Sequence, residues 1–447
     1  EKEGVETEGY AELPLFIWAN KSFLKKGLVV PRVPDDRNFE AESDILLEPE
    51  TRVHVHVDMS MKVQAIESGS EGVTVVDVRA GSERPIPAES LELVDWEKAY
   101  LDLLEYKERK GLTNLVVRPD TPRRILATTE PERLYSLVAD ESVFRPKSFA
   151  GTALLQEAAV NILRKYADAF YRTNRERWDS NHMVYRPLDE SDPNLSFNRG
   201  LVRERESSRY VVNIQRSESE LVSAVEKLID EVDRLYTEET RELPRIHFDR
   251  HLYQPLLVEH RDKVTMTPPG LNKSESQFVR DMKAYWAHEK DKLLAKVEVF
   301  LLRNLGRGAG ISFFEERRFY PDFILWIMDG KKQHIIFVEP HGMLHAEAYK
   351  HDDKARLHEA LPSLAKDIGG RSKRKDISLD SYIISATSYE HLRKKYDDGT
   401  WNREKFADAH ILFLERSEEY DYMERIFTEQ LTRRCKDMTA RSEWEIR

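Results

Sequence analysis

The chain has 447 residues, of which 40% are hydrophobic and 34% are charged, and its formal net charge is −11 at pH 7. This composition is typical of folded domains with hydrophobic cores rather than of a disordered chain, and the length suggests roughly three domains of ~150 residues. The negative charge excludes a protein that binds nucleic acid over its whole surface, but it leaves room for a local basic channel.

The sequence shows no membrane or export signal. No apolar run approaches the ~18 residues that would indicate a membrane span, and the acidic start EKEGVETEGYAEL lacks the pattern of a signal peptide. Because the first residue is Glu1 rather than Met, we expect the sequence to be part of a longer protein. The single Cys435 excludes an internal disulfide framework, so we expect a cytoplasmic protein in a reducing compartment.

Residues 1–95 are predicted to form a small β-rich module. Short alternating stretches separated by Ser, Gly and Pro turns predict strands in TRVHVHVD, KVQAIES, VTVVDVRA and SLELV. His54 and His56 are two residues apart and therefore share one strand face. With no third ligand close in the sequence, this pair favours an exposed polar face over a metal site.

Residues 96–245 are predicted to be a mainly helical region that links or supports the other parts. Two apolar stripes recur at helical spacing, one formed by Ala153, Leu154, Ala158, Ile162 and Leu163 and one by Leu221, Val225, Leu228, Val232 and Leu235. We interpret these helices as packing elements.

Residues 246–447 are predicted to form an α/β domain. The stretch LNKSESQFVRDMKAYW predicts a helix with a capping box formed by Ser274 and Gln277. Beyond it, strand-like apolar runs alternate with helical segments, which is typical of an α/β fold.

A hairpin is predicted in FYPDFILWIMDGKKQHIIFVEPHG, residues 319–342, because Asp329-Gly330 is a turn signal between two apolar runs. If the loop has four residues, Asp322 faces Glu339 directly; if it has two, Asp322 faces Phe337 and Glu339 is its diagonal neighbour. Both registers place the two acids on one face, since side chains alternate along a strand. Both runs are apolar on both faces, which indicates a sheet that is covered on each side.

Two close carboxylates at the edge of an apolar sheet repel each other unless they share a proton or bind a cation. A hard divalent ion such as Mg²⁺, or Mn²⁺, fits such a pair. His341 follows Glu339 by two residues and can point to the same face. The pattern therefore indicates metal-assisted attack of water on a phosphodiester, although either acid alone would be an ordinary residue at a strand end. A zinc site built from His341, His345, Glu347 and His351 is the less favoured interpretation, because Gly342 weakens the helix that it needs.

The surrounding segments resemble a known family. LNKSESQFVRDMKAYW, LLRNLGRGAGISFFE and YPDFILWIMDGKKQHIIFVEP are similar to the C-terminal nuclease region of type III restriction-like DEAD/DEAH helicase subunits, which carries a PD-(D/E)xK nuclease motif. HFDRHLYQPLL and LPLFIWANKSF resemble segments that follow the motor in such proteins. The resemblance implies a restriction-endonuclease-like fold for residues 246–447 and a Mg²⁺-dependent endodeoxyribonuclease of a prokaryotic restriction or antiphage system. Since the sequence has no G-x-x-x-x-G-K-[ST] loop, the ATP-dependent helicase motor is expected outside these residues or on a partner subunit.

The resemblance also implies roles for single residues. Asp322 and Glu339 match the metal-binding acids, and Glu275 matches the acid of the preceding helix, where it could also serve only the helix dipole. His341 stands where the family usually has Lys, which favours a rival interpretation as a catalytically degenerate fold that acts as a DNA clamp or assembly scaffold. Candidates for phosphate contact are Lys350, Lys354, Arg371, Lys373 and Arg374, although for each lysine taken singly a solvated face is slightly favoured.

Overall fold

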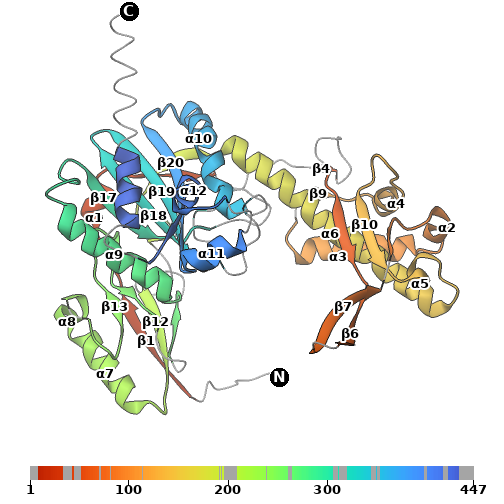
Figure 1. The fold of residues 1–447 in the computed structure, drawn as a ribbon, viewed down its shortest axis with the longest axis horizontal. Coiled ribbons are helices and arrows are strands. Elements are labelled where there is room, and N and C mark those ends of the chain that lie inside the picture. Colours follow the sequence, from red (N-terminus) through yellow and green to blue (C-terminus); the bar gives the residue numbers. More distant parts are fainter. Residues whose placement is uncertain are drawn as a thin grey trace, which may run out of the picture. The chain divides into compact units, whose positions relative to one another are not determined.

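The structure is a computed structural model, and it describes residues 9–33, 43–44, 52–69, 72–80, 82–112, 114–190, 192, 194–195, 209–237, 239–259, 264–305, 311, 320–343, 349, 353–396, 400–415 and 421–431. The chain divides into two compact units: unit 1 comprises Glu1–Arg32 and Met183–Arg447, and unit 2 comprises Val33–His182. Both combine helices with strands, so the fold is mixed α/β (Figure 1). Within the described residues, no helix has the length and apolarity that crossing a membrane requires.

This division differs from the three segments expected from the sequence. The first residues of the chain belong to unit 1, because β1 (Tyr10–Phe16) pairs with β12 (Arg209–Gln215) and β3 (Val29–Arg32) pairs with β11 (Val184–Pro187). Pairing over such a sequence separation leaves no local periodicity. Segments that look like one β-rich module in the sequence are therefore shared between two units.

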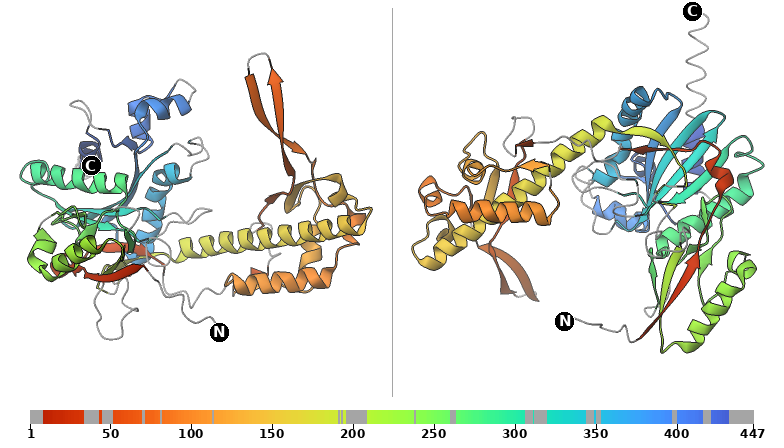
Figure 2. Two further views of the ribbon diagram at one scale, coloured as in Figure 1. Left: turned by 90° about the horizontal axis from the view of Figure 1, so that it is seen from below. Right: turned by 180° about the vertical axis from the view of Figure 1, so that it is seen from behind.

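Unit 2 is built around α6 (Phe149–His182), which packs against α3 (Trp96–Arg109). Its central sheet has the order β5-β10-β8, and the β6–β7 hairpin stands away from α6 (Figure 2). The prediction of a strand in SLELV was wrong, because these residues form the end of a short helix and a turn. The remaining elements of this unit are β4 (Ser43–Asp44), β5 (Val55–Asp58), β6 (Met61–Gly69), β7 (Gly72–Ala80), β8 (Ser82–Arg84), α2 (Ala88–Leu91), β9 (Leu115–Val116), α4 (Thr121–Leu126), β10 (Tyr135–Ala139) and α5 (Glu141–Phe144).

Unit 1 contains a three-stranded antiparallel sheet of order β1-β12-β16, and α7 (Ser219–Asp230) packs against β1 and β12. Short strand pairs connect it to the rest of the unit. The third strand of the sheet is β16 (Val264–Thr267). The other small elements of this part of unit 1 are β2 (Trp18–Ala19), α1 (Lys21–Leu24), α8 (Val232–Thr237), β13 (Arg245–Ile246), β14 (Tyr253–Gln254) and β15 (Leu256–Leu257).

The main sheet of unit 1 has the order β17-β18-β19-β20-β21 (Figure 1). The first three strands are antiparallel and the last three are parallel. α9 packs against β19 and α10 packs against β20. The elements are α9 (Lys273–Glu289), β17 (Glu298–Arg303), β18 (Phe323–Asp329), β19 (Lys332–His341), α10 (Asp353–Ser372), β20 (Ile377–Ser385), α11 (Tyr389–Lys395), α12 (Arg403–Asp408) and β21 (Ile411–Phe413).

The predicted hairpin is β18–β19, and its register is the first of the two expected. Met328 pairs with Gln333 and Asp329 pairs with Lys332, and Gly330 takes a φ of 61° in the turn, a conformation that glycine adopts without steric cost. Both strands are buried along almost their whole length. Coverage of both faces explains why neither strand alternates between apolar and polar residues.

A candidate acidic site at the end of the β18–β19 hairpin

Asp322 and Glu339 come together at one end of the hairpin, as the register requires. Asp322 directly precedes β18, and its backbone N–H donates to Oε2 of Glu339 at 3.0 Å. Glu339 lies near the end of β19 and is only 7% exposed. The strand geometry thus brings two acids to the same edge of the main sheet, where one of them is anchored by the backbone of the other.

The pair carries an electrostatic conflict. Burial is the largest cause that raises the pKa of the Asp322 carboxyl to about 8, and the charges of Glu339 and Glu275 add to it. The cations Arg303 and Lys354 act in the opposite direction. Ionised Asp322 would therefore be repelled by Glu339 and Glu275 in a largely buried region, and a bound cation would offset this repulsion.

Lys354 supplies one of those positive charges directly. It is the second residue of α10, and its Nζ lies 3.0 Å from Oε1 of Glu339. The Lys354 side chain is 47% exposed while that of Glu339 is 9% exposed, so the ammonium group bridges the buried acid and the solvent. The sequence suggested Lys354 only as a phosphate contact; the structure places it in the acidic site.

His341 is the last residue of β19, two residues beyond Glu339, and it is partly exposed. Its Nδ1 lies 3.5 Å from the backbone oxygen of Glu339. The Glu339 carboxylate accepts from Lys354 Nζ. His341 lies at the same sheet edge as the acids, and its chemical role stays a prediction.

Glu275 lies beside the pair and is engaged within the protein. It forms a capping box with Asn272, the N-cap residue of α9, and Oε2 also accepts from an Arg303 guanidinium nitrogen at 3.2 Å. The predicted capping box of Ser274 and Gln277 was therefore wrong by two residues. Ser274 instead donates its Oγ hydrogen to the Pro340 carbonyl at 2.7 Å, which ties α9 to β19.

Arg303 is a part of this site that the sequence did not reveal. It ends β17, its side chain is 11% exposed, and it donates to the carbonyls of Pro269 and Gly270 as well as to Glu275. Burial raises the pKa of Glu275 and the Arg303 charge opposes this rise. A single arginine in a β-strand gives no signal of such a role before the fold is known.

The donor set fits a hard divalent ion in part. Asp322 and Glu339 offer carboxylate oxygens, which Mg²⁺ prefers, and Mg²⁺ commonly keeps several waters and takes few protein ligands. Within the described ranges, no group of three or more His, Cys, Asp or Glu side chains is arranged to hold a metal ion. Of the residues considered for zinc, His345, Glu347 and His351 lie outside the described residues.

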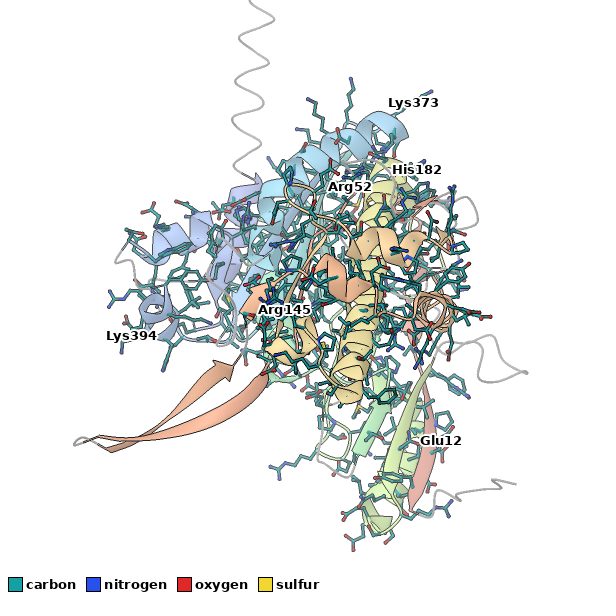
Figure 3. The ribbon with its side chains drawn as sticks, turned by 90° about the vertical axis from the view of Figure 1, so that its right-hand side faces the viewer. Glu12, Arg52, Arg145, His182, Lys373 and Lys394 are labelled. Atoms are coloured by element: carbon teal, nitrogen blue, oxygen red, sulfur yellow. The ribbon has the colours of Figure 1, made fainter. Side chains whose placement is uncertain are left out.

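Of the predicted phosphate contacts, Lys354 is brought to the acids, whereas Arg371, Lys373 and Arg374 lie at or beyond the other end of α10. Arg371 lies in the last turn of α10, and an α-helix rises ~1.5 Å per residue, so Arg371 lies on the order of 25 Å from Lys354 along the helix. Its Nε donates to the Met183 carbonyl at 2.9 Å, and Arg374 makes two bonds to Asp376 at 2.8 and 2.7 Å. Lys373 directly follows α10 and is exposed (Figure 3). Lys350 lies outside the described residues.

Comparisons with protein-family models, curated proteins and solved structures found no match to the chain. The site is therefore defined by its own chemistry. It consists of two facing acids at a sheet edge, a lysine on one of them, and a third acid held by a buried arginine.

Proposed function

We propose that unit 1 contains a restriction-endonuclease-like domain that hydrolyses DNA phosphodiester bonds with Mg²⁺ or Mn²⁺. The observation that carries this proposal is the juxtaposition of Asp322, Glu339 and Lys354 at one sheet edge. Two acids that face each other under burial are an unfavourable arrangement unless they share a proton or bind a cation. The sequence resemblance to PD-(D/E)xK nucleases adds the expectation that this cation works on a phosphodiester.

Each residue has a distinct task in this proposal. Asp322 and Glu339 would hold the ion, and a bound divalent ion makes water more acidic and offsets charge on a phosphate. Lys354 can orient the attacking water or stabilise the negative charge that develops on the phosphate, because its side chain ends in hydrogen-bond donors. Arg303 and Asn272 hold Glu275 in place beside the pair.

This proposal moves the basic role from His341 to Lys354. The family pattern expects a lysine two residues after the second acid, and this chain has His341 there. A lysine from the following helix reaches the same carboxylate in space. The absence of Lys at position 341 is therefore weaker support for a degenerate site than the sequence suggested.

The substrate and the partner rest on the resemblance alone. We propose DNA as the substrate and an ATP-dependent helicase motor, outside these residues or on a partner subunit, as the partner that delivers it. In this proposal the chain is the nuclease part of a prokaryotic restriction or antiphage assembly.

A non-catalytic DNA clamp or assembly scaffold is the second candidate, and one observation favours it. Both carboxylate oxygens of Glu339 already have partners in the protein, the Asp322 N–H and Lys354 Nζ. A degenerate site in which the lysine replaces the metal would look like this.

One experiment separates the two candidates. Supercoiled plasmid is incubated with the chain and Mg²⁺ or Mn²⁺, and titration calorimetry measures binding of the same ions to the wild type and to Asp322→Asn. A nuclease binds the ion through Asp322 and nicks the plasmid. Ion binding that is absent, or equal in both proteins, together with intact plasmid supports the clamp.

A further inference from the structure

A stack of rings lies against α10, beyond the acidic site. His358 of α10 stacks on His410, with ring centroids 4.3 Å apart and an interplanar angle of 14°. His410 stacks in turn on Tyr382 of β20, at 4.5 Å and 9°. His410 directly precedes β21, so the stack joins α10 to two strands of the main sheet.

His410 is held rigidly in this stack. Its Nδ1 lies 2.9 Å from Oδ1 of Asp380 and 2.9 Å from the Ser381 carbonyl; since both are acceptors, Nδ1 carries the hydrogen. Asp380 is 3% exposed and also accepts from Gln430 Nε2 at 2.7 Å and from the Ser381 N–H at 2.8 Å. A ring fixed by a saturated, buried carboxylate provides a defined surface for α10.

The His358 ring is also held by a hydrogen bond, in this case within α10. Its Nδ1 lies 2.9 Å from the Ala355 carbonyl, to which it can donate. Burial and the neighbouring His410 lower the pKa of His358, which keeps the ring neutral against the second imidazole.

The position of the stack along α10 gives it a consequence for the acidic site. His358 lies four residues after Lys354, so the two side chains share one face of the helix. Apolar burial of Ala355 and Leu357 presses the helix on the sheet, but hydrophobic contact has no preferred direction. Ring stacking does have a preferred geometry, and it acts one turn from the lysine.

We propose that His358 is a positioning residue whose stack on His410 sets where α10 places the Lys354 ammonium group against Glu339. The geometric part of this inference concerns the ion pair only. Its meaning for catalysis rests on the proposed nuclease function.

The test follows Lys354 itself, in the full chain with lysines dimethylated by ¹³C, a change that keeps their charge. Lys354→Arg assigns its resonance. In His358→Ala, which favours the helix but removes the ring, the resonance moves toward those of exposed lysines. In His358→Phe, which restores a flat ring, it stays near the wild-type position. Ser363→Ala, at an exposed position of the same helix, is the matched control and leaves it unchanged.

His410→Asn tests the other side of the stack. Asn tolerates the φ of 55° at this position but offers no ring, so it must move the Lys354 resonance as His358→Ala does. Circular dichroism confirms that each variant is folded. An unchanged resonance in either folded ring-deletion variant overturns the proposal, and so does a shift of equal size in His358→Phe.

Cleavage by the unmodified chain gives an independent readout. If the nuclease proposal holds, His358→Ala lowers kcat by roughly 3- to 10-fold at unchanged KM, the value of one aromatic pair, and His358→Phe restores it. If no form of the chain cuts DNA, the nuclease proposal fails and the resonance still decides the positioning role. Equal kcat in His358→Ala and the wild type, with a shifted resonance, means that the position of Lys354 does not limit the reaction.

Discussion

At the scale of single residues, the charge of Asp322 is decided by its surroundings rather than by its chemistry. A free aspartate ionises near pH 3.8, but burial and then the neighbouring Glu339 raise the pKa of Asp322 to about 8. The folded state therefore disfavours the ionised form at neutral pH, where the unfolded chain carries it at no cost. The pair therefore lowers the stability of the fold in the absence of metal, and the same negative charge favours the binding of a cation.

The first prediction follows from this conflict. Asp322→Asn keeps the backbone N–H that Glu339 accepts and removes the charge, so in EDTA at pH 7 the melting temperature should hold or rise. With Mg²⁺ the same variant should lose cleavage at least ~10²-fold, because it removes an oxygen ligand. Differential scanning calorimetry and plasmid nicking measure the two effects. A variant that cuts at the wild-type rate would remove Asp322 from the site.

His251 gives a second prediction, on pH. The ring is fully buried. Its Nε2 accepts from the backbone N–H of Arg303 at 2.8 Å, and its Nδ1 donates to the Tyr253 carbonyl at 2.7 Å. Burial lowers the pKa of His251 to about 3, while an unfolded histidine titrates near ~6.5. The unfolded chain therefore binds the extra proton first, and this contribution to stability is lost as the pH falls from ~6.5 toward 3, by up to ~1.4 kcal/mol per pH unit.

Denaturant unfolding of the wild type and of His251→Gln between pH 7 and pH 4 measures that slope. The variant should be less stable at pH 7 and should lose less stability on acidification. His288→Gln replaces an exposed histidine and should follow the wild type as the matched control. Parallel pH profiles for wild type and His251→Gln would contradict the assignment.

At the scale of elements, the hairpin could be predicted and the helices around it only in part. The Asp-Gly turn and the alternation of side chains along a strand sufficed to place Asp322 and Glu339 on one face, but they left open whether the two acids face each other directly. The cap of α9 was misplaced because Asn272 and Ser274 are both good N-cap residues and only the backbone distinguishes them. Lys354 was found as a basic residue but not as a partner of Glu339, because the sequence does not say which helix end returns to the acids.

The third prediction compares the two basic candidates carried by β19 and α10. Lys354→Ala should lower kcat by about 10²–10⁴-fold, the usual effect of losing a positioned acid–base or charge-stabilising group. His341→Ala should lower it less, because Lys354 donates directly to the Glu339 carboxylate, whereas Nδ1 of His341 lies 3.5 Å from the Glu339 backbone oxygen. Rates with saturating Mg²⁺ on one plasmid substrate decide the order. A larger loss in His341→Ala would return the basic role to the strand.

At the scale of the whole molecule, the sequence predicted a mixed α/β protein and missed how its segments group. The long helix α6 was expected from its apolar stripe, yet Ala153 and Leu154 of that stripe are exposed while Ala158, Ile162 and Leu163 are buried in unit 2. The pairing of β1 and β3 with later strands joins residues near 10 and 30 to residues near 210 and 185. Such contacts depend on the packing of the complete unit, which a local pattern does not contain.

The last prediction concerns how the whole chain meets DNA. The net charge is −11, Arg371 and Arg374 are engaged within the protein, and their end of α10 lies far from the acids. Few phosphates can be neutralised at the site, so the chain alone should bind duplexes only in the non-specific range of about 10⁻⁴–10⁻⁶ M, with little dependence on sequence. Fluorescence anisotropy with several duplexes measures this.

Lys373→Glu should leave cleavage within about twofold, because one exposed charge that far from the acids is largely screened at physiological salt. Loss of cleavage in Lys373→Glu would show that DNA reaches the acids over the basic end of α10. Tight binding to one sequence by the isolated chain would show that no separate motor is needed to deliver the DNA.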